Sequence, residues 1–77
     1  MKNKDLQHSI GLKIRKIREN KLHISQKELA KKCNLDSAYF SRVENGKQNL
    51  TLETLEIICD ALDVSLKELL DSNVENN

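Results

Sequence analysis

Two short helical signals stand next to each other in the stretch Ser25–Gly46, which reads SQKELAKKCNLDSAYFSRVENG. Ser25 and Glu28 form the pattern Ser-x-x-Glu, which favours a helix N-terminus because each side chain can hydrogen-bond the backbone N–H of the other residue. Asp36, a residue type favoured at N-caps, begins the second helix, and Gly46 suits the left-handed position that ends it. A connection of about three to four residues sets two helices at roughly 90–120°. The stretch therefore predicts two helices that cross steeply and do not form an antiparallel hairpin.

Helical signals also dominate the rest of the chain, which has no strand pattern of useful length. Apolar residues recur at helical spacing near the N-terminus, at Leu6, Ile10, Ile14 and Ile17. This stripe predicts a first helix over about residues 5–20, and its other face is cationic, with Lys13, Arg15, Lys16 and Arg18. Farther along, Thr51 begins a fourth helix and Ser65 a fifth, which repeats the Ser-x-x-Glu pattern. The fourth helix has its own apolar stripe, at Leu52, Leu55, Ile58, Ala61 and Leu62.

The length of 77 residues allows one small domain. We expect residues 1–77 to form a single all-α domain of five helices, with its core at about 6–70 and a flexible tail at 71–77. Cys33 and Cys59 lie in no short motif, so we interpret them as core residues in a reducing cytoplasm, with a disulfide or metal role as the alternative. No apolar run approaches the ~20 residues of a membrane span, and the N-terminus lacks a signal-peptide pattern. We therefore expect a cytoplasmic protein without cofactor, metal or membrane contact.

Charge is divided unevenly along the chain. Residues 1–32 hold ten Lys or Arg and three Asp or Glu, a balance of +7, whereas residues 33–77 hold three and nine, a balance of −6. The two balances add up to the net charge of +1. This division indicates one face for a polyanion and another face for a different purpose, with a chance scatter of charge as the alternative.

The second helix of the steeply crossing pair has an outward face suited to DNA. Such a pair is the helix-turn-helix arrangement, in which the second helix enters the major groove. Phe40 and Val43 must face the core, which leaves small, polar and cationic residues outward and no acid among them. Arg42 can bind guanine through two hydrogen bonds, with a solvated side chain or an internal ion pair as the alternative. The outward residues are Ser37, Ala38, Ser41 and Arg42, with Tyr39 at the boundary.

Side chains that can donate to phosphate flank this helix. Gln26 and Lys27 lie in the first turn of the preceding helix, and Asn45, Lys47, Gln48 and Asn49 follow the second helix with no acid after Glu44. Hydrogen-bond donors at the edge of a groove fix a protein on the DNA backbone without reading sequence. We predict phosphate contacts by these residues, with an ordinary polar surface loop as the alternative for the second group.

The sequence SQKELAKKCNLDSAYFSRVENGKQNLTLETLEIICDALDVSLKELL resembles helix-turn-helix transcription regulators of the Cro and phage-repressor type, and the likeness covers about residues 10–70. Within this family, NLDSAYFSRVENGKQNLT is most similar to controller proteins of restriction–modification systems. The resemblance implies a lambda-repressor-like five-helix domain. It also implies a two-fold homodimer that binds a palindromic operator in double-stranded DNA.

The resemblance implies base contacts by Ser37, Ala38, Tyr39 and Arg42. It also implies phosphate contacts by Gln26, Asn45, Lys47, Gln48 and Asn49, and a buried ion pair between Arg18 and Glu44. The chain departs from the family in two ways. The turn KLHIS lacks the glycine that many members have there and is one residue longer. Ser37 stands where controller proteins commonly carry a bulky basic residue, so the operator is expected to differ from theirs.

The expected dimer interface uses apolar residues of the last helix and the tail, at Leu66, Leu69, Leu70 and Val74, although some of these must also close the monomer core. The acidic residues of the last two helices face away from DNA and could contact RNA polymerase, with a solvated face as the alternative. The alternative function is that of an antitoxin, or of a phage or host repressor, that acts with a protein partner. An enzyme is disfavoured because His8 and His23 have no carboxylate, cysteine or serine placed with them.

Overall fold

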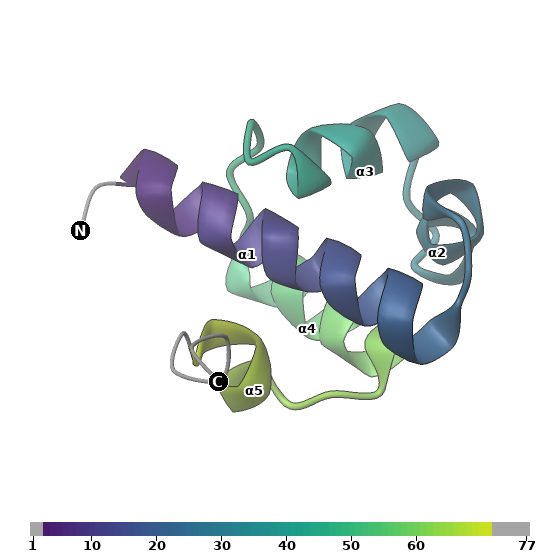
Figure 1. Cartoon of the computed structure of the whole chain (residues 1–77). Coiled ribbons are helices and arrows are strands. Elements are labelled where there is room, and N and C mark those ends of the chain that lie inside the picture. The colour runs from purple at the N-terminus through teal and green to yellow at the C-terminus, as the bar shows by residue number, and fades with distance from the viewer. Residues whose placement is uncertain (1–2, 72–77) are drawn as a thin grey trace.

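The chain folds into five α-helices and one π-helical turn in the computed structural model, which describes residues 3–71 and the side chains of residues 5–71. In order they are α1 (Asn3–Ile17), η1 (Arg18–Leu22), α2 (Gln26–Lys32), α3 (Ser37–Glu44), α4 (Leu52–Leu62) and α5 (Leu66–Leu70). Figure 1 shows α1 crossing the middle of the view, with α3 above it and α5 below. The predicted all-α, five-helix architecture is confirmed. The last six residues of the predicted tail, 72–77, lie outside the described residues.

The helix starts follow the capping signals in the sequence. Ser25 Oγ accepts a hydrogen bond from Glu28 N at 3.0 Å, and Ser25 N donates to Glu28 Oε1 at 2.8 Å. The same reciprocal pair begins α5 at Ser65, and Thr51 accepts from the backbone of Thr54 at the start of α4. Each bond satisfies a backbone donor that the helix itself leaves without an acceptor. The predicted N-caps are confirmed.

The core draws side chains from every α-helix. Its most deeply buried members are Phe40, Ile14, Leu29, Ile58, Leu62 and Val43. Cys33 and Cys59 also lie in this core as free thiols, and burial raises the pKa of both. Leu6 and Leu52, which the sequence assigned to apolar stripes, are instead exposed. None of the helices between residues 3 and 71 has the length and apolarity needed to cross a bilayer.

A glycine lets α1 approach α3 closely. A Cβ atom on Gly11 would lie 2.4 Å from the carbonyl oxygen of Val43 and 2.7 Å from that of Glu44. Both neighbours are backbone atoms, so a side chain here would push the two helices apart. Gly11 therefore fixes how α3 sits on the central helix.

The connection between α1 and α2 differs from the sequence prediction. The first helix is α-helical only to Ile17 and then widens into the π turn η1, which ends at Leu22. His23 follows with φ of 54°, and its N–H donates to Arg18 O. A π turn holds one more residue than an α turn, so it accommodates the additional residue of the segment KLHIS. His23 takes the left-handed conformation that glycine adopts more readily.

Two lysines from the N-terminal half hydrogen-bond the ends of the last helices. Lys13, which the sequence placed on the outer cationic face, is buried, and its Nζ donates to Asp71 O at 2.6 Å just after α5. Lys21 Nζ donates to Asp63 O at 2.8 Å, at the C-cap of α4. Both place a positive charge where helix carbonyls lack partners, which stabilises a helix C-terminus. Lys13 is thus a structural residue and not part of a surface for polyanions.

Candidate nucleic-acid interface

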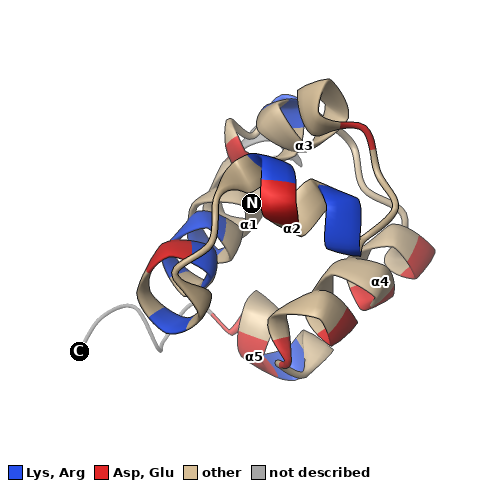
Figure 2. Ribbon diagram, turned by 90° about the vertical axis from the view of Figure 1, so that its right-hand side faces the viewer, with Lys and Arg blue, Asp and Glu red and all other residues tan. Residues whose placement is uncertain are grey.

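Charges separate across the folded molecule as they do along the chain. Figure 2 shows acidic residues along α4 and α5 and basic residues on α1 and α2, with Glu28 of α2 and Lys67 of α5 among the exceptions. The exposed acids of the C-terminal half include Glu53, Glu56, Asp60, Asp63 and Glu68. On the basic side, Arg15 Nε lies 3.3 Å from Glu19 Oε2, which offsets part of its charge. The lysines of α2 are exposed, at Lys27, Lys31 and Lys32.

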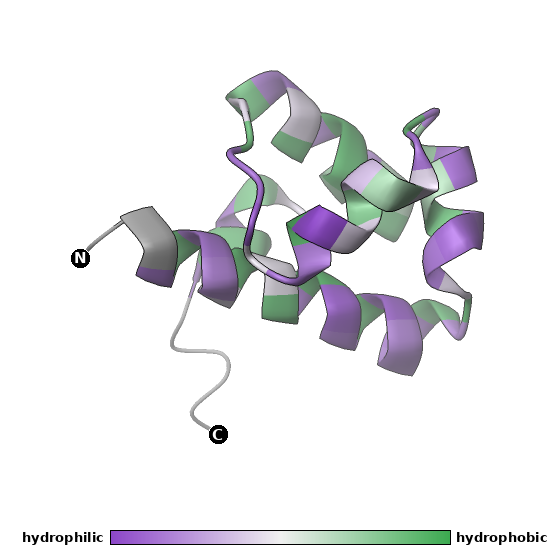
Figure 3. Cartoon of the chain, turned by 90° about the horizontal axis from the view of Figure 1, so that it is seen from above, coloured by the Kyte–Doolittle hydropathy of each residue, from purple (hydrophilic) through white to green (hydrophobic). Residues whose placement is uncertain are grey.

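The helix α3 presents the face that the sequence predicted. Seen from above, α3 lies over the rest of the domain (Figure 3). Phe40 and Val43 are fully buried, which confirms the predicted inward side. Ser37, Ala38 and Arg42 are exposed, while Tyr39 is half-buried at the boundary. The outward side of α3 therefore offers small side chains at its start and one long cation a turn later.

The backbone at the start of α3 is already engaged. The Asp36 carboxylate accepts from Ala38 N at 3.0 Å and from Tyr39 N at 3.3 Å. A phosphate would compete with this carboxylate for the same donors and would be repelled by its charge. The first turn of α3 is accordingly suited to contact bases through its side chains, and phosphate contacts must come from elsewhere.

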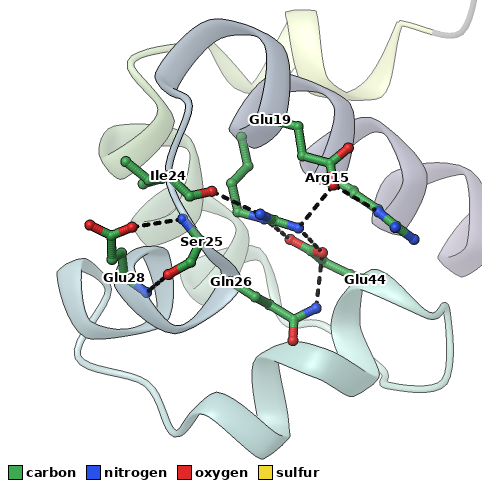
Figure 4. A network of polar contacts seen from close by, with 8 residues as sticks. Arg15, Glu19, Ile24, Ser25, Gln26, Glu28 and Glu44 are labelled. Atoms are coloured by element: carbon green, nitrogen blue, oxygen red, sulfur yellow. Dashed lines mark hydrogen bonds and ion pairs between the residues drawn. The ribbon is translucent and has the colours of Figure 1, made fainter.

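A buried polar network holds α3 against the two preceding helical segments (Figure 4). Arg18 donates from Nε to Glu44 Oε2 at 2.7 Å and from Nη2 to Glu44 Oε1 at 2.9 Å, so the expected ion pair is present. The two residues are 7% and 3% exposed. The hydrogen bond to Glu44 raises the pKa of Arg18, and burial opposes this rise. The pair joins η1 to the last residue of α3.

Gln26 and Ile24 extend the network to α2. Gln26 Nε2 donates to Glu44 Oε1 at 3.0 Å, and Arg18 Nη1 donates to Ile24 O at 2.8 Å. A glutamine amide has two N–H groups, so one remains for a phosphate after the bond to Glu44. The network thus fixes the side chain of a predicted phosphate ligand as well as the position of α3.

Arg42 is held by neutral groups. Its guanidinium carbon lies 5.8 Å from the centre of the Tyr39 ring, and its Nε donates to Gln48 Oε1 at 3.1 Å. Among residues 5–71, no carboxylate pairs with it, so the alternative of an internal ion pair does not apply. The full positive charge of Arg42 stays available to a ligand on the surface of α3.

The loop after α3 gathers the remaining predicted phosphate ligands. Asn45, Lys47 and Asn49 are exposed, and Gln48 is half-buried. Asn49 Oδ1 accepts a hydrogen bond from Gln7 Nε2, so the amide nitrogen of Asn49 keeps its donors for other partners. Sequence reasoning missed Gln7, and no local signal could reveal it because the two residues are 42 positions apart.

The predicted interface leucines differ in exposure. Leu69 is 2% exposed and belongs to the monomer core, so it is corrected from an interface residue to a core residue. Leu66 is half-buried, Leu70 is 44% exposed, and Val74 lies outside the described residues. Leu70 instead lines a hollow of about 330 Å³ together with two exposed leucines that the sequence had not assigned to an interface, Leu6 and Leu52. The reason is the direction in which α5 docks: it turns Leu69 inward and Leu70 outward.

Known proteins match both the sequence and the fold. A sequence model of the helix-turn-helix family matches residues 14–69. Control protein C.MunI from a Mycoplasma species is 39% identical over 71 residues, which cover 92% of this chain and 95% of that protein. Control protein C.BamHI from Bacillus amyloliquefaciens is 42% identical over 67 residues, or 87% and 83% of the two chains. The crystal structure of the restriction-modification controller protein C.AhdI from Aeromonas hydrophila aligns with a TM-score of 0.82 at 30% identity, covering 90% of this chain and 99% of that one.

These matches agree with the geometry of α2 and α3, and they confirm the resemblance to regulators of the Cro and phage-repressor type. The family consists of transcription regulators and is not an enzyme class. The chain therefore belongs to the helix-turn-helix family and is a DNA-binding regulator.

Proposed function

We propose that the chain is a controller-type regulator that binds a palindromic operator as a homodimer, with α3 in the major groove. The observation that carries this proposal is the exposed, acid-free outer side of α3, braced from below by the buried pair of Arg18 and Glu44. A helix that reads bases must be rigid and must approach base edges closely, and small side chains at its start permit that approach. The relatives named as control proteins support the controller role.

In this proposal, contacts divide between bases and phosphates. Arg42 is the principal base reader because it is exposed, charged and long enough to form two hydrogen bonds with guanine. Ser37, Ala38 and Tyr39 face the bases in the same major groove of the DNA. Phosphate contacts come from both sides of α3, at Gln26, Lys27, Asn45, Lys47 and Asn49. Such contacts position the domain and carry most of the salt dependence of binding.

A homodimer is proposed to form at the hollow lined by Leu6, Leu52 and Leu70. Leu52 is 69% exposed, an unfavourable state for a leucine that a partner surface would relieve. Leu70, the last residue of α5, lines this hollow, whereas Leu66 at the start of α5 does not. A dimer that reads two half-sites must hold its two copies of α3 about one duplex turn apart, roughly 34–36 Å.

Selection of binding sites from a pool of random duplexes tests this proposal. We expect the wild-type chain to enrich two inverted half-sites whose centres lie about 10 base pairs apart. Sedimentation of the selected complex should then show two chains per operator. Enrichment of no sequence, or of a lone half-site bound by one chain, would refute the proposed function. A contact of the acidic residues on α4 and α5 with RNA polymerase stays a prediction.

A further inference from the structure

We propose that Gln48 is a positioning residue that orients the guanidinium of Arg42 for base recognition. The inference rests on the proposed function, since it needs Arg42 to read a base. It differs from the sequence prediction, which assigned Gln48 to phosphate. It identifies a specificity determinant in the loop after α3, outside the recognition helix itself.

Two groups restrain the guanidinium from different directions. The guanidinium carbon lies over the Tyr39 ring, 5.8 Å from the ring centre. Gln48 Oε1 accepts from Nε at 3.1 Å. Because a guanidinium is planar and rigid, a hydrogen bond that holds its Nε–H also restricts the directions of its other N–H groups. An exposed arginine without such restraints would sample many rotamers and lose that freedom on binding.

The restrained geometry leaves the useful end of Arg42 available. Within residues 5–71, no hydrogen bond engages its two terminal Nη groups. These two groups can donate side by side to N7 and O6 of one guanine. Gln48 therefore occupies the one donor that this end-on arrangement does not need.

Gln48 is itself anchored, as a positioning residue must be. Its Nε2 donates to Asn49 O at 3.4 Å, and the loop is tied to α3 by the hydrogen bond from Lys47 N to Arg42 O at 2.9 Å. Gln7 of α1 holds Asn49 from the other side. The loop thus keeps a fixed position relative to α3, and the hydrogen bond to Gln48 holds the Arg42 guanidinium in a fixed position as well.

The amide chemistry of Gln48 suits this role better than a carboxylate would. A glutamate at the same place would accept from Arg42 as well, but it would neutralise the charge that attracts DNA and would repel phosphate. A neutral acceptor orients the cation and leaves its charge intact. The Oε1 atom of Gln48 accepts from Arg42 inside the protein, which ties this side chain to the guanidinium.

The test compares Gln48→Leu, Arg42→Ala and the double variant on the operator selected by the wild-type chain and on its single base-pair substitutions. Leucine keeps a similar volume but cannot accept a hydrogen bond. We expect Gln48→Leu to reduce discrimination by about two- to tenfold, only at the base pair that Arg42→Ala also affects. In the Arg42→Ala background it should have no further effect there. Asn45→Ala, which removes another exposed amide near the same loop, is the matched control. It should weaken binding to all DNA sequences by the same factor.

Two outcomes would overturn the role of Gln48. One is a uniform loss of affinity on every sequence that adds to the effect of Arg42→Ala, since a phosphate contact behaves that way. The other is seen in the protein without DNA, by NMR of the arginine Nε–Hε groups. Gln48→Leu should shift the Arg42 signal and leave that of Arg15 in place, and an unchanged Arg42 signal contradicts the proposal. If the wild-type chain selects no operator, the proposed function fails, and the NMR result still decides whether Gln48 holds Arg42.

Discussion

The connections before and after α2 both change the direction of the chain between two helices, but different contacts stabilise them. Each contains a residue other than glycine in the left-handed region, His23 with φ of 54° before α2 and Asn34 with φ of 57° after it. After α2, Leu35 N donates to Ala30 O at 2.8 Å, and Asp36 caps α3 directly. All these partners lie within a few residues of one another along the chain.

The connection before α2 depends instead on a distant partner. Arg18 donates to Ile24 O within the connection, but its guanidinium is held in place by Glu44, which is 26 positions away. One connection thus has only local partners, whereas the other also includes an ion pair with a residue of α3. We expect the two to respond differently to substitution, with the larger losses at the long-range brace.

Glu44→Ala should have the largest effect on stability because it leaves the buried guanidinium of Arg18 without its carboxylate. Removal of one partner from a buried ion pair costs about 3–5 kcal/mol. Urea unfolding at neutral pH measures this loss of stability. Glu44→Gln keeps an acceptor for Arg18 and should lose less stability, so it replaces the alanine variant in the measurement if that variant does not fold. The control is Glu19→Ala: Glu19 lies 3.7 Å from the same guanidinium but is about half exposed, so its loss should cost about 0.2–1 kcal/mol. Equal losses for the two alanine variants would contradict the long-range brace.

Asp36→Ala tests the locally encoded connection and should cost about 1 kcal/mol, the usual value for a lost N-cap. The variant removes the acceptor for Ala38 N and Tyr39 N at the start of α3. Urea unfolding again measures the change. Asp36→Asn retains a capping oxygen and should lose much less. If asparagine proved as costly as alanine, the stabilisation would come from the charge of Asp36 and not from its cap.

Local signals explain which parts of the fold could be predicted from the sequence. Ser25, Asp36, Thr51 and Ser65 all mark helix starts through side chains that bond the backbone two or three residues away. Phe40 and Val43 could be assigned inward because helical spacing alone places them on one side. These helix starts and inward positions share one property: their physical cause lies within one helical turn.

Contacts between distant segments could not be predicted in this way. Lys13 bonds the end of α5 at a separation of 58 residues, and nothing near it in the sequence distinguishes it from an exposed lysine. The difference between Leu69 and Leu70 arises from the direction in which α5 docks. The pair of Arg18 and Glu44 came from the family resemblance alone, and the restraint of Arg42 by Gln48 depends on how the loop folds back on α3.

His23→Gly sharpens the comparison of the two left-handed residues. A left-handed conformation costs an ordinary residue roughly 1–2 kcal/mol, and glycine avoids this cost but loses about 0.5–1 kcal/mol through the entropy of the unfolded chain. We therefore expect a net gain of about 0.5 kcal/mol for His23→Gly. Asn34→Gly should gain close to nothing because asparagine tolerates this conformation. Thermal unfolding of both variants measures the difference, and an equal gain at the two positions would show that residue type does not set the strain.

Glu28→Gln should have the smallest effect, confined to acid pH. The N–H of Ser25 donates to the Glu28 carboxylate at 2.8 Å and lowers the pKa of that carboxyl in the folded chain. The unfolded chain then binds the proton at a higher pH than the folded chain does, so unfolding is favoured as the pH falls. The contribution of this capping box is present above the ordinary pKa of a glutamate and disappears as the pH falls through the lowered value. Unfolding free energy measured against pH should show a shallower acid slope for Glu28→Gln than for Glu56→Gln, an exposed glutamate of α4 without a capping role. Identical acid slopes for these two variants would show that the charge of Glu28 adds nothing measurable to the cap before α2, whose neutral bond from Glu28 N to Ser25 Oγ would remain.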